Sequence, residues 1–161
     1  MEALDDAIAE GCTEVWELAE RFGTPAYLID ENTVRENCRE YLRAATAEFG
    51  ADALPLYASK ALCFTGMYKI AAQEGLGIDC VSGGELYTAK KAGFPAEKIY
   101  FHGNNKTDAD IEYAIEKGVG YFVVDNAEEL NSIEKIAIEK RKNYIEKNHT
   151  RLIFFFSFKR V

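Results

Sequence analysis

Residues 54–61 read Leu-Pro-Leu-Tyr-Ala-Ser-Lys-Ala, an apolar run with strand character that delivers one lysine, Lys60, at its carboxyl end. In an α/β domain the active site assembles at the carboxyl ends of the parallel strands. A primary amine held there is suited to form a Schiff base with a carbonyl compound. Lys60 is therefore the first candidate for a reactive group, because a lysine in an otherwise apolar strand has no obvious solubilising purpose.

Apolar strand-like runs alternate with longer amphipathic stretches along the rest of the chain. The repeat is roughly 20 to 30 residues, the length of a βα unit with short loops, and it predicts a parallel sheet with helices outside it. The predicted helices cover residues 13–22, 31–49, 65–74, 84–92, 108–117 and 127–147. The predicted strands cover residues 25–29, 54–58, 77–81, 99–102 and 120–124, with a last strand from residue 152.

Several polar residues at the predicted helix starts have a purely structural interpretation. Asp30 is placed to cap the helix that follows it. Ser82 and Glu85 fit a capping box, in which Ser82 accepts from the Glu85 backbone N–H and the glutamate carboxylate accepts from the Ser82 N–H. Asp125 and Glu128 fit a second box of the same kind.

Composition narrows the classes of function. The chain has 161 residues, 48% hydrophobic and 29% charged, which is typical of one soluble globular domain. Its apolar runs are shorter than the roughly 20 residues that cross a bilayer, and its acidic beginning is unlike a signal peptide, so we expect a cytoplasmic protein. The scattered cysteines form no metal-binding pattern, and a net charge of -8 disfavours nucleic acid as a partner.

Polar residues that follow the later strands are expected to converge with Lys60 at one edge of the sheet. They are Asp79, Ser82, His102, Asn104, Asn105 and Asp125. Each has a plainer alternative: His102 as a hydrogen-bonded interior imidazole, for example, and the two asparagines as turn residues. A dinucleotide site is not predicted, because residues 75–77 lack the third glycine of that fingerprint and precede their strand.

Three ordered motifs resemble the diaminopimelate decarboxylase family. They are Tyr-Ala-Ser-Lys-Ala at residues 57–61, Gly-Ile-Asp-Cys-Val-Ser-Gly-Gly-Glu-Leu at 77–86 and Phe-His-Gly-Asn-Asn-Lys at 101–106. The resemblance runs from about residue 25 to residue 137. It implies an α/β fold, part of the (β/α)₈ TIM-type barrel of the alanine-racemase-like enzymes, which use pyridoxal 5'-phosphate. It also implies decarboxylation of meso-diaminopimelate to L-lysine, an amino-acid substrate, by homodimers.

The same resemblance suggests roles for individual residues. Lys60 would hold pyridoxal 5'-phosphate covalently through its amine, Asp79 would be a polar partner near that lysine, and His102 would line the cofactor pocket. Supporting roles would fall to Ser82, Glu85 and Asn104. No metal is implied.

The resemblance also suggests a domain organisation. Residues 1–24 would be a helical lead-in, and residues 25–161 would form about half of the barrel, without its second half or the β-rich domain of the family. Because the family pattern is lost after the phenylalanines at 154–156, we expect a frameshift or early stop and a chain that is marginally stable and inactive alone. Two alternatives remain: a non-catalytic barrel protein that binds the same cofactor, and an unrelated nucleotide-binding α/β domain.

Overall fold

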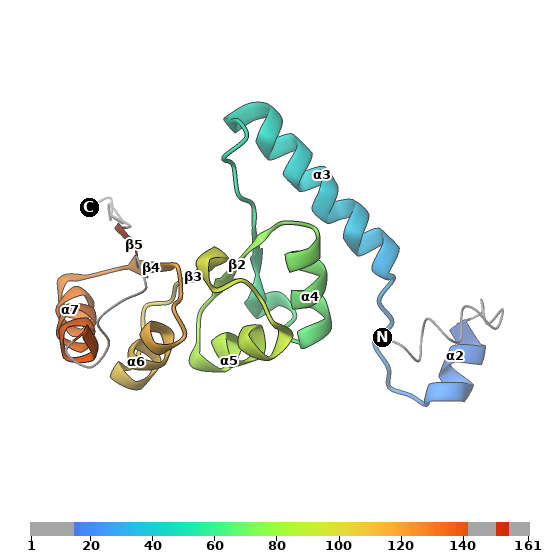
Figure 1. Cartoon of the computed structure of the whole chain (residues 1–161). Coiled ribbons are helices and arrows are strands. Elements are labelled where there is room, and N and C mark those ends of the chain that lie inside the picture. Colours follow the sequence, from blue (N-terminus) through green and yellow to red (C-terminus); the bar gives the residue numbers. More distant parts are fainter. Residues whose placement is uncertain (1–14, 142–150, 155–161) are drawn as a thin grey trace, which may run out of the picture. The chain divides into compact units, whose positions relative to one another are not determined.

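The computed structural model describes residues 15–141 and 151–154 of the chain (Figure 1). Its contacts divide the chain into two units, Met1–Val34 and Arg35–Val161. Parts of two predicted helices, residues 13–14 and 142–147, lie outside the described residues. Among the described helices, none combines the length and the apolar character that a membrane crossing needs.

The first unit contains helix α2, Val15–Phe22, which ends where Gly23 adopts a φ of 81°. The strand predicted at residues 25–29 is wrong, because residues 26–30 have no regular secondary structure and pair with no strand in the described part of the chain. An extended segment becomes a strand only through hydrogen bonds to a neighbour. Tyr27, in the middle of this segment, is 99% exposed.

Helix α3, Glu31–Phe49, has the predicted bounds and the predicted cap. The Asp30 carboxylate accepts hydrogen bonds from the backbone N–H of Asn32 at 2.9 Å and of Thr33 at 3.3 Å. It also accepts from the Thr33 hydroxyl at 2.7 Å, and this bond is the main cause that lowers the pKa of Asp30. A carboxylate here also meets the positive end of the helix dipole.

The second unit alternates strands and helices as the hydrophobic pattern predicts. Its strands are β1 (Leu56–Ala58), β2 (Gly77–Cys80), β3 (Ile99–Phe101), β4 (Tyr121–Val124) and β5 (Arg151–Phe154). The helices after β1 are α4 (Thr65–Gln73), α5 (Gly83–Ala92), α6 (Asp108–Glu116) and α7 (Ala127–Arg141), with single 3₁₀ turns η1 (Ser59–Ala61) and η2 (Ala96–Lys98). The predicted elements of this unit are confirmed, with small shifts at their ends.

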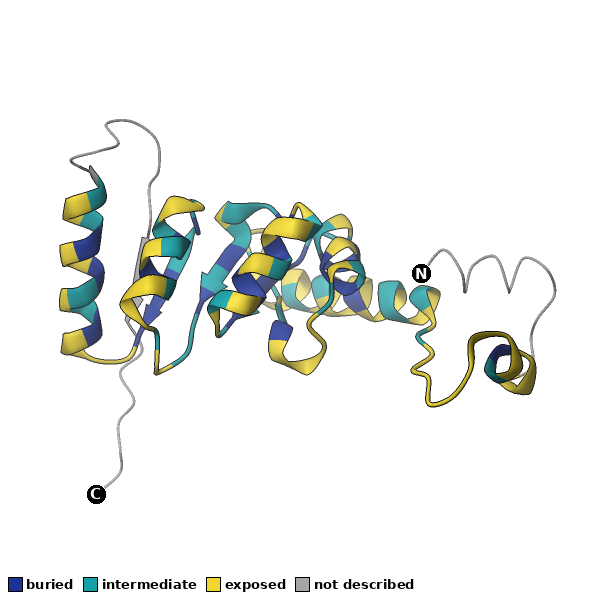
Figure 2. Cartoon of the chain, turned by 90° about the horizontal axis from the view of Figure 1, so that it is seen from below, coloured by how far each residue is buried: buried dark blue, intermediate teal, exposed yellow. Residues whose placement is uncertain are grey.

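The five strands form one parallel sheet in the order β1-β2-β3-β4-β5. Helices α4 to α7 cover one face of this sheet (Figures 1 and 2). One row of paired residues runs across the sheet from strand to strand: Ala58, Asp79, Tyr100, Tyr121 and Arg151. This sequential order confirms the predicted α/β class and is the order of consecutive strands in a (β/α)₈ barrel.

The core lies between the sheet and these helices, where Figure 2 shows the buried strand residues. Ile78 and Cys80 on β2 are fully buried, whereas Asp79 between them is only half-buried. Phe101 and Phe122 pair across β3 and β4, are fully buried, and meet edge to face with 5.8 Å between ring centroids. This alternation follows from the two-residue period of a strand, which sends successive side chains to opposite faces.

The predicted capping box at α5 is only half correct. The Ser82 hydroxyl accepts from the Glu85 backbone N–H at 3.3 Å, as predicted. The Glu85 carboxylate does not return to the Ser82 N–H; its Oε2 accepts from the Val81 N–H at 2.8 Å instead. Oε2 also contacts the Ser59 hydroxyl, which draws the carboxylate past Ser82 toward the end of β1.

The predicted box of Asp125 and Glu128 at α7 is wrong by one residue. Because α7 begins at Ala127, its cap is Asn126, whose side-chain oxygen accepts from the Glu129 N–H at 2.8 Å. The Glu129 carboxylate then reaches back to the Asp125 N–H at 3.3 Å. Asn126 and Glu129 are therefore separated by the same number of residues as Ser82 and Glu85.

We expect Ile78→Val to lower the free energy of unfolding by about 0.5–1.5 kcal/mol, because it removes a buried methylene where little can move to fill the space. The matched control is Ile138→Val on α7, where the side chain is 49% exposed and should change stability little. Urea unfolding of both variants measures this. Equal losses at the two positions would contradict the assignment of the core.

Candidate functional site

Lys60 lies in the turn η1, directly after β1, and is exposed. Lys60 therefore follows the strand and does not belong to it. The expectation that a lysine within an apolar strand must have a chemical role does not apply to this position. What the structure does provide is its place at the carboxyl end of β1. Two residues before it, Ala58 pairs with Asp79 on the neighbouring strand.

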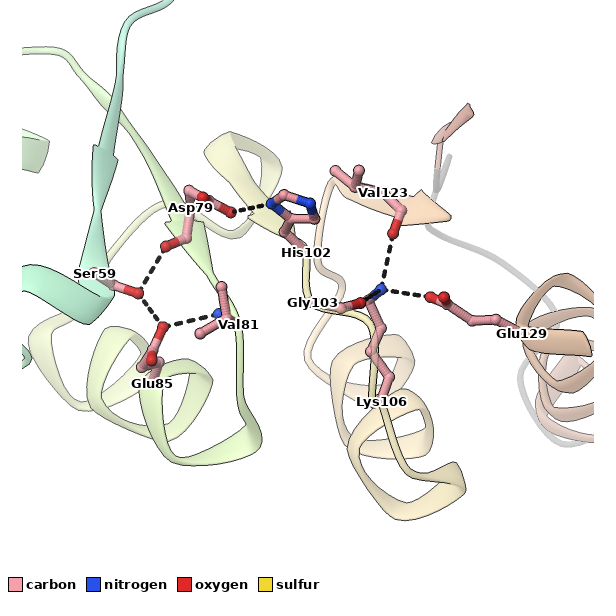
Figure 3. A network of polar contacts seen from close by, with 9 residues as sticks. All are labelled: Ser59, Asp79, Val81, Glu85, His102, Gly103, Lys106, Val123 and Glu129. Atoms are coloured by element: carbon pink, nitrogen blue, oxygen red, sulfur yellow. Dashed lines mark hydrogen bonds and ion pairs between the residues drawn. The ribbon is translucent and has the colours of Figure 1, made fainter. Parts of the chain in front are cut away.

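Asp79 and His102 point toward one another across the ends of β2 and β3 (Figure 3). The His102 Nδ1 lies 3.6 Å from the Asp79 Oδ1, and the two side chains are 41% and 23% exposed. Oδ1 is nevertheless buried and has no hydrogen-bond partner among the residues that the structure describes. The structure therefore brings these two predicted site residues together and leaves one carboxylate oxygen without a donor.

The row that contains Asp79 faces away from helices α4 to α7. Its next members, Tyr100 and Tyr121, stack with ring centroids 4.1 Å apart and an angle of 10° between the rings. Both are half-buried, unlike the fully buried Phe101 and Phe122 that follow them on the opposite face. The face turned away from α4 to α7 thus carries aromatic rings together with the acid and the imidazole.

The loop after β3 passes close to the end of β2. The His102 backbone N–H donates to the Cys80 carbonyl at 2.8 Å. At Gly103 the φ is 100°, and an added Cβ would lie 2.9 Å from the Val81 carbonyl oxygen. Only glycine therefore fits both the conformation and the space at this point. Asn104, predicted as a supporting residue, is exposed in the same loop.

Glu85 anchors the turn that carries Lys60. Its carboxylate is buried, accepts from the Val81 N–H and contacts the Ser59 hydroxyl (Figure 3). Ser59 is itself fully buried and donates to the Asp79 carbonyl at 2.7 Å. No role for Ser59 is predicted from the sequence.

Lys106 and Glu129 form a second buried anchor, and the sequence analysis missed both residues. The Lys106 side chain is 0% exposed and pairs with the Glu129 carboxylate. Its Nζ also donates to the carbonyls of Gly103 at 2.5 Å and Val123 at 2.8 Å (Figure 3). The signal that could have found Glu129 is its spacing from the cap Asn126, which repeats the spacing of the first anchor.

The apolar hollow and the cysteine side chains of the described residues do not contribute to this site. An apolar hollow of about 510 Å³ is lined by α3 and the segment before β1, including Tyr41, Phe49 and Leu54, and by none of the predicted site residues. Residues 15–141 and 151–154 contain no group of three side chains suited to bind a metal ion. Within the described part of the chain the three cysteines Cys38, Cys63 and Cys80 are free thiols.

Comparisons with known proteins agree with one another. The family model for the pyridoxal-binding domain of pyridoxal-dependent decarboxylases matches residues 33–148. The diaminopimelate decarboxylase of Bacillus methanolicus is 48% identical over 130 residues, which cover 81% of this chain and 30% of the relative. The enzyme of the same name from Bacillus subtilis is 46% identical over 122 residues, covering 76% of this chain and 28% of the relative.

Solved structures show the same similarity. Diaminopimelate decarboxylase from M. jannaschii in complex with L-lysine superposes with a TM-score of 0.73 and 35% identity, covering 86% of this chain and 31% of that chain. Lysine/ornithine decarboxylase from Vibrio vulnificus in complex with putrescine gives a TM-score of 0.65 at 28% identity, covering 84% and 33%. The chain therefore spans about 30% of the length of the curated relatives it matches.

We expect Lys106→Met to lower the free energy of unfolding by about 3–5 kcal/mol, because the variant leaves the buried Glu129 carboxylate unpaired. The control is Lys140→Met, which removes the ion pairs of a half-buried lysine with the exposed Glu112 and Glu116. That control should change stability only slightly, since solvent screens exposed pairs. Chemical denaturation measures both, and similar losses would contradict a buried anchor at Lys106.

The cysteines should differ in reactivity. Burial raises the pKa of the Cys80 thiol to about 12 and also raises that of Cys38. At pH 8 both thiols are thus protonated, and only the thiolate is nucleophilic. Of these three described cysteines, iodoacetamide should modify the exposed Cys63 first in the native chain, with Cys38 and Cys80 protected until urea unfolds it. Peptide mass mapping measures the order, and fast native alkylation of Cys80 would contradict it.

Proposed function

The chain belongs to the pyridoxal-dependent decarboxylase family, and on that premise we propose that it holds pyridoxal 5'-phosphate at the carboxyl ends of its strands. We further propose that the activity of the whole protein is decarboxylation of meso-diaminopimelate to L-lysine. The names of its relatives at 46–48% identity support that substrate over ornithine or arginine. The activity is a proposal for the whole protein because the chain spans about 30% of those relatives.

The observation that carries the proposal is the buried Oδ1 of Asp79, which lacks a donor among the described residues. Leaving a buried acceptor unsatisfied costs about 1–3 kcal/mol, and more for a charged group. Lys60 lies two residues after Ala58, the strand partner of Asp79, and the His102 Nδ1 lies 3.6 Å from the same oxygen. A positively charged nitrogen bound at this edge of the sheet would supply the missing donor. The residues present therefore fit a group that binds through a protonated nitrogen.

When bound, pyridoxal phosphate would supply a ring that accepts the electron pair left behind by departing carbon dioxide. The chain's own residues have simpler tasks in this proposal. Lys60 provides the amine that binds the cofactor and that a substrate amine replaces. Asp79 holds positive charge beside that amine, and His102 lines the pocket at the end of the next strand. Ser82, Glu85 and Asn104 support the loops around these residues.

The remaining parts of the proposal concern the setting of the enzyme. We propose a small amino acid as the substrate, a homodimer as the assembly and the cytoplasm as the location. The net charge of -8 disfavours nucleic acid as a partner. The three free cysteines of the described residues support a reducing compartment. The boundary between a lead-in of residues 1–24 and a cofactor domain from residue 25 also stays a prediction.

Borohydride trapping tests this proposal. The Lys60 amine condenses with the aldehyde of pyridoxal phosphate with loss of water, and borohydride reduces the carbon–nitrogen double bond to a stable secondary amine. We expect one equivalent of label, mapped to Lys60 by mass spectrometry. Lys60→Arg should abolish it, whereas Lys69→Arg, an exposed lysine on α4, should leave it unchanged. Label spread over many lysines, or no label, would overturn the proposal.

A further inference from the structure

Ser59 is the residue through which the Lys60 turn is attached to the rest of the sheet. It is the first residue of η1, is 0% exposed and precedes Lys60 directly. The turn has no cap of its own, because Ala58 at its start makes no side-chain hydrogen bond. The hydroxyl of Tyr57 donates to the Leu62 carbonyl at 3.0 Å, but this bond closes the turn only upon itself.

The contacts of Ser59 that Figure 3 draws reach two other elements. Its hydroxyl lies 2.7 Å from the Asp79 carbonyl oxygen on β2 and also contacts the Glu85 carboxylate on α5. A hydroxyl has a single hydrogen to donate, so these two acceptors share it. Both acceptors are fixed, Asp79 by its strand and Glu85 by the Val81 N–H at 2.8 Å.

Packing alone does not require a hydroxyl at this position. A fully buried polar group is tolerated only when it is hydrogen-bonded, and an alanine would bury the same backbone without that demand. The exposed Lys60, by contrast, has a long stem with four rotatable bonds. The chain can set the reach of such an amine only by holding the backbone from which the stem projects.

We propose that Ser59 is a positioning residue for Lys60, whose hydroxyl fixes the turn η1 against Asp79 and Glu85. This inference rests on the proposed function, because Lys60 is taken as the amine that binds the cofactor. In this proposal, the hydrogen bond of Ser59 sets the distance between the backbone of Lys60 and the Asp79 carboxylate.

The experiment compares Ser59→Ala with the unchanged chain and with two further variants. Thr107→Ala removes the hydroxyl that caps α6, which costs about 1 kcal/mol of stability without touching η1. Ser59→Thr keeps the hydroxyl. The two readouts are the rate of borohydride-trapped pyridoxal-phosphate labelling at Lys60 and the hydrogen exchange of the peptide that covers residues 56–64.

In Ser59→Ala, Lys60 labelling should slow about fivefold to tenfold, the factor that corresponds to one lost hydrogen bond, while labelling of other lysines stays unchanged. Exchange should rise in residues 56–64, and Ser59→Thr should restore at least part of both. Unchanged labelling in Ser59→Ala, or equal slowing in Thr107→Ala, would overturn the inference.

Failure of the proposed function gives a different pattern. If the unchanged chain does not label Lys60, cofactor binding is wrong, and hydrogen exchange alone then decides the role of Ser59. Faster exchange confined to residues 56–64 in Ser59→Ala would support the anchor. Unchanged exchange there would overturn it.

Discussion

Two glutamate carboxylates, those of Glu85 and Glu129, are buried where helices follow strands, and each must be supplied with hydrogen-bond donors. One donor is a backbone N–H just before the helix cap, from Val81 or Asp125. The second donor comes from the segment that follows the neighbouring strand. It is the Ser59 hydroxyl after β1 for Glu85, and the Lys106 ammonium after β3 for Glu129. Each buried charge therefore joins two successive βα units, and the loops at the carboxyl ends of the strands are held by these joints.

The two faces of the sheet carry different kinds of residues: one face packs the apolar core and the other carries the polar candidate site. Ile78, Cys80 and the paired phenylalanines are buried against the helices, where apolar surface leaves water. Asp79 and the stacked tyrosines occupy the other face, with His102 beyond the end of β3. A polar side chain can change on that second face without opening the core. Glu85 and Glu129 are an exception to this separation. Their carboxylates are buried on the helix-covered side, yet they hold the loops that carry the polar residues of the other face.

The sequence was sufficient for the βα repeat because strands and helices have different hydrophobic periods, and the ranges from α3 to β4 needed little correction. It failed at residues 25–29, where strand propensity was present but no partner strand is described. The α7 cap was misplaced because Asp125 and Asn126 are both good caps, and local pattern cannot choose the first helical residue. Lys60 was predicted at the carboxyl end of its strand and lies just beyond that end, but the burial of the Lys106 side chain was not predicted. Burial of a lysine depends on a partner distant in the chain, and no local pattern contains that information.

The sequential order of the strands also bears on how the chain acquires its structure. Among the described residues, each strand pairs with the strands that precede and follow it along the chain, so a contact in this sheet closes a loop of one βα unit. The entropy cost of closing a loop grows only slowly with its length, so pairing of consecutive strands keeps that cost modest. The sheet can grow by one strand at a time, in the order in which the ribosome releases them.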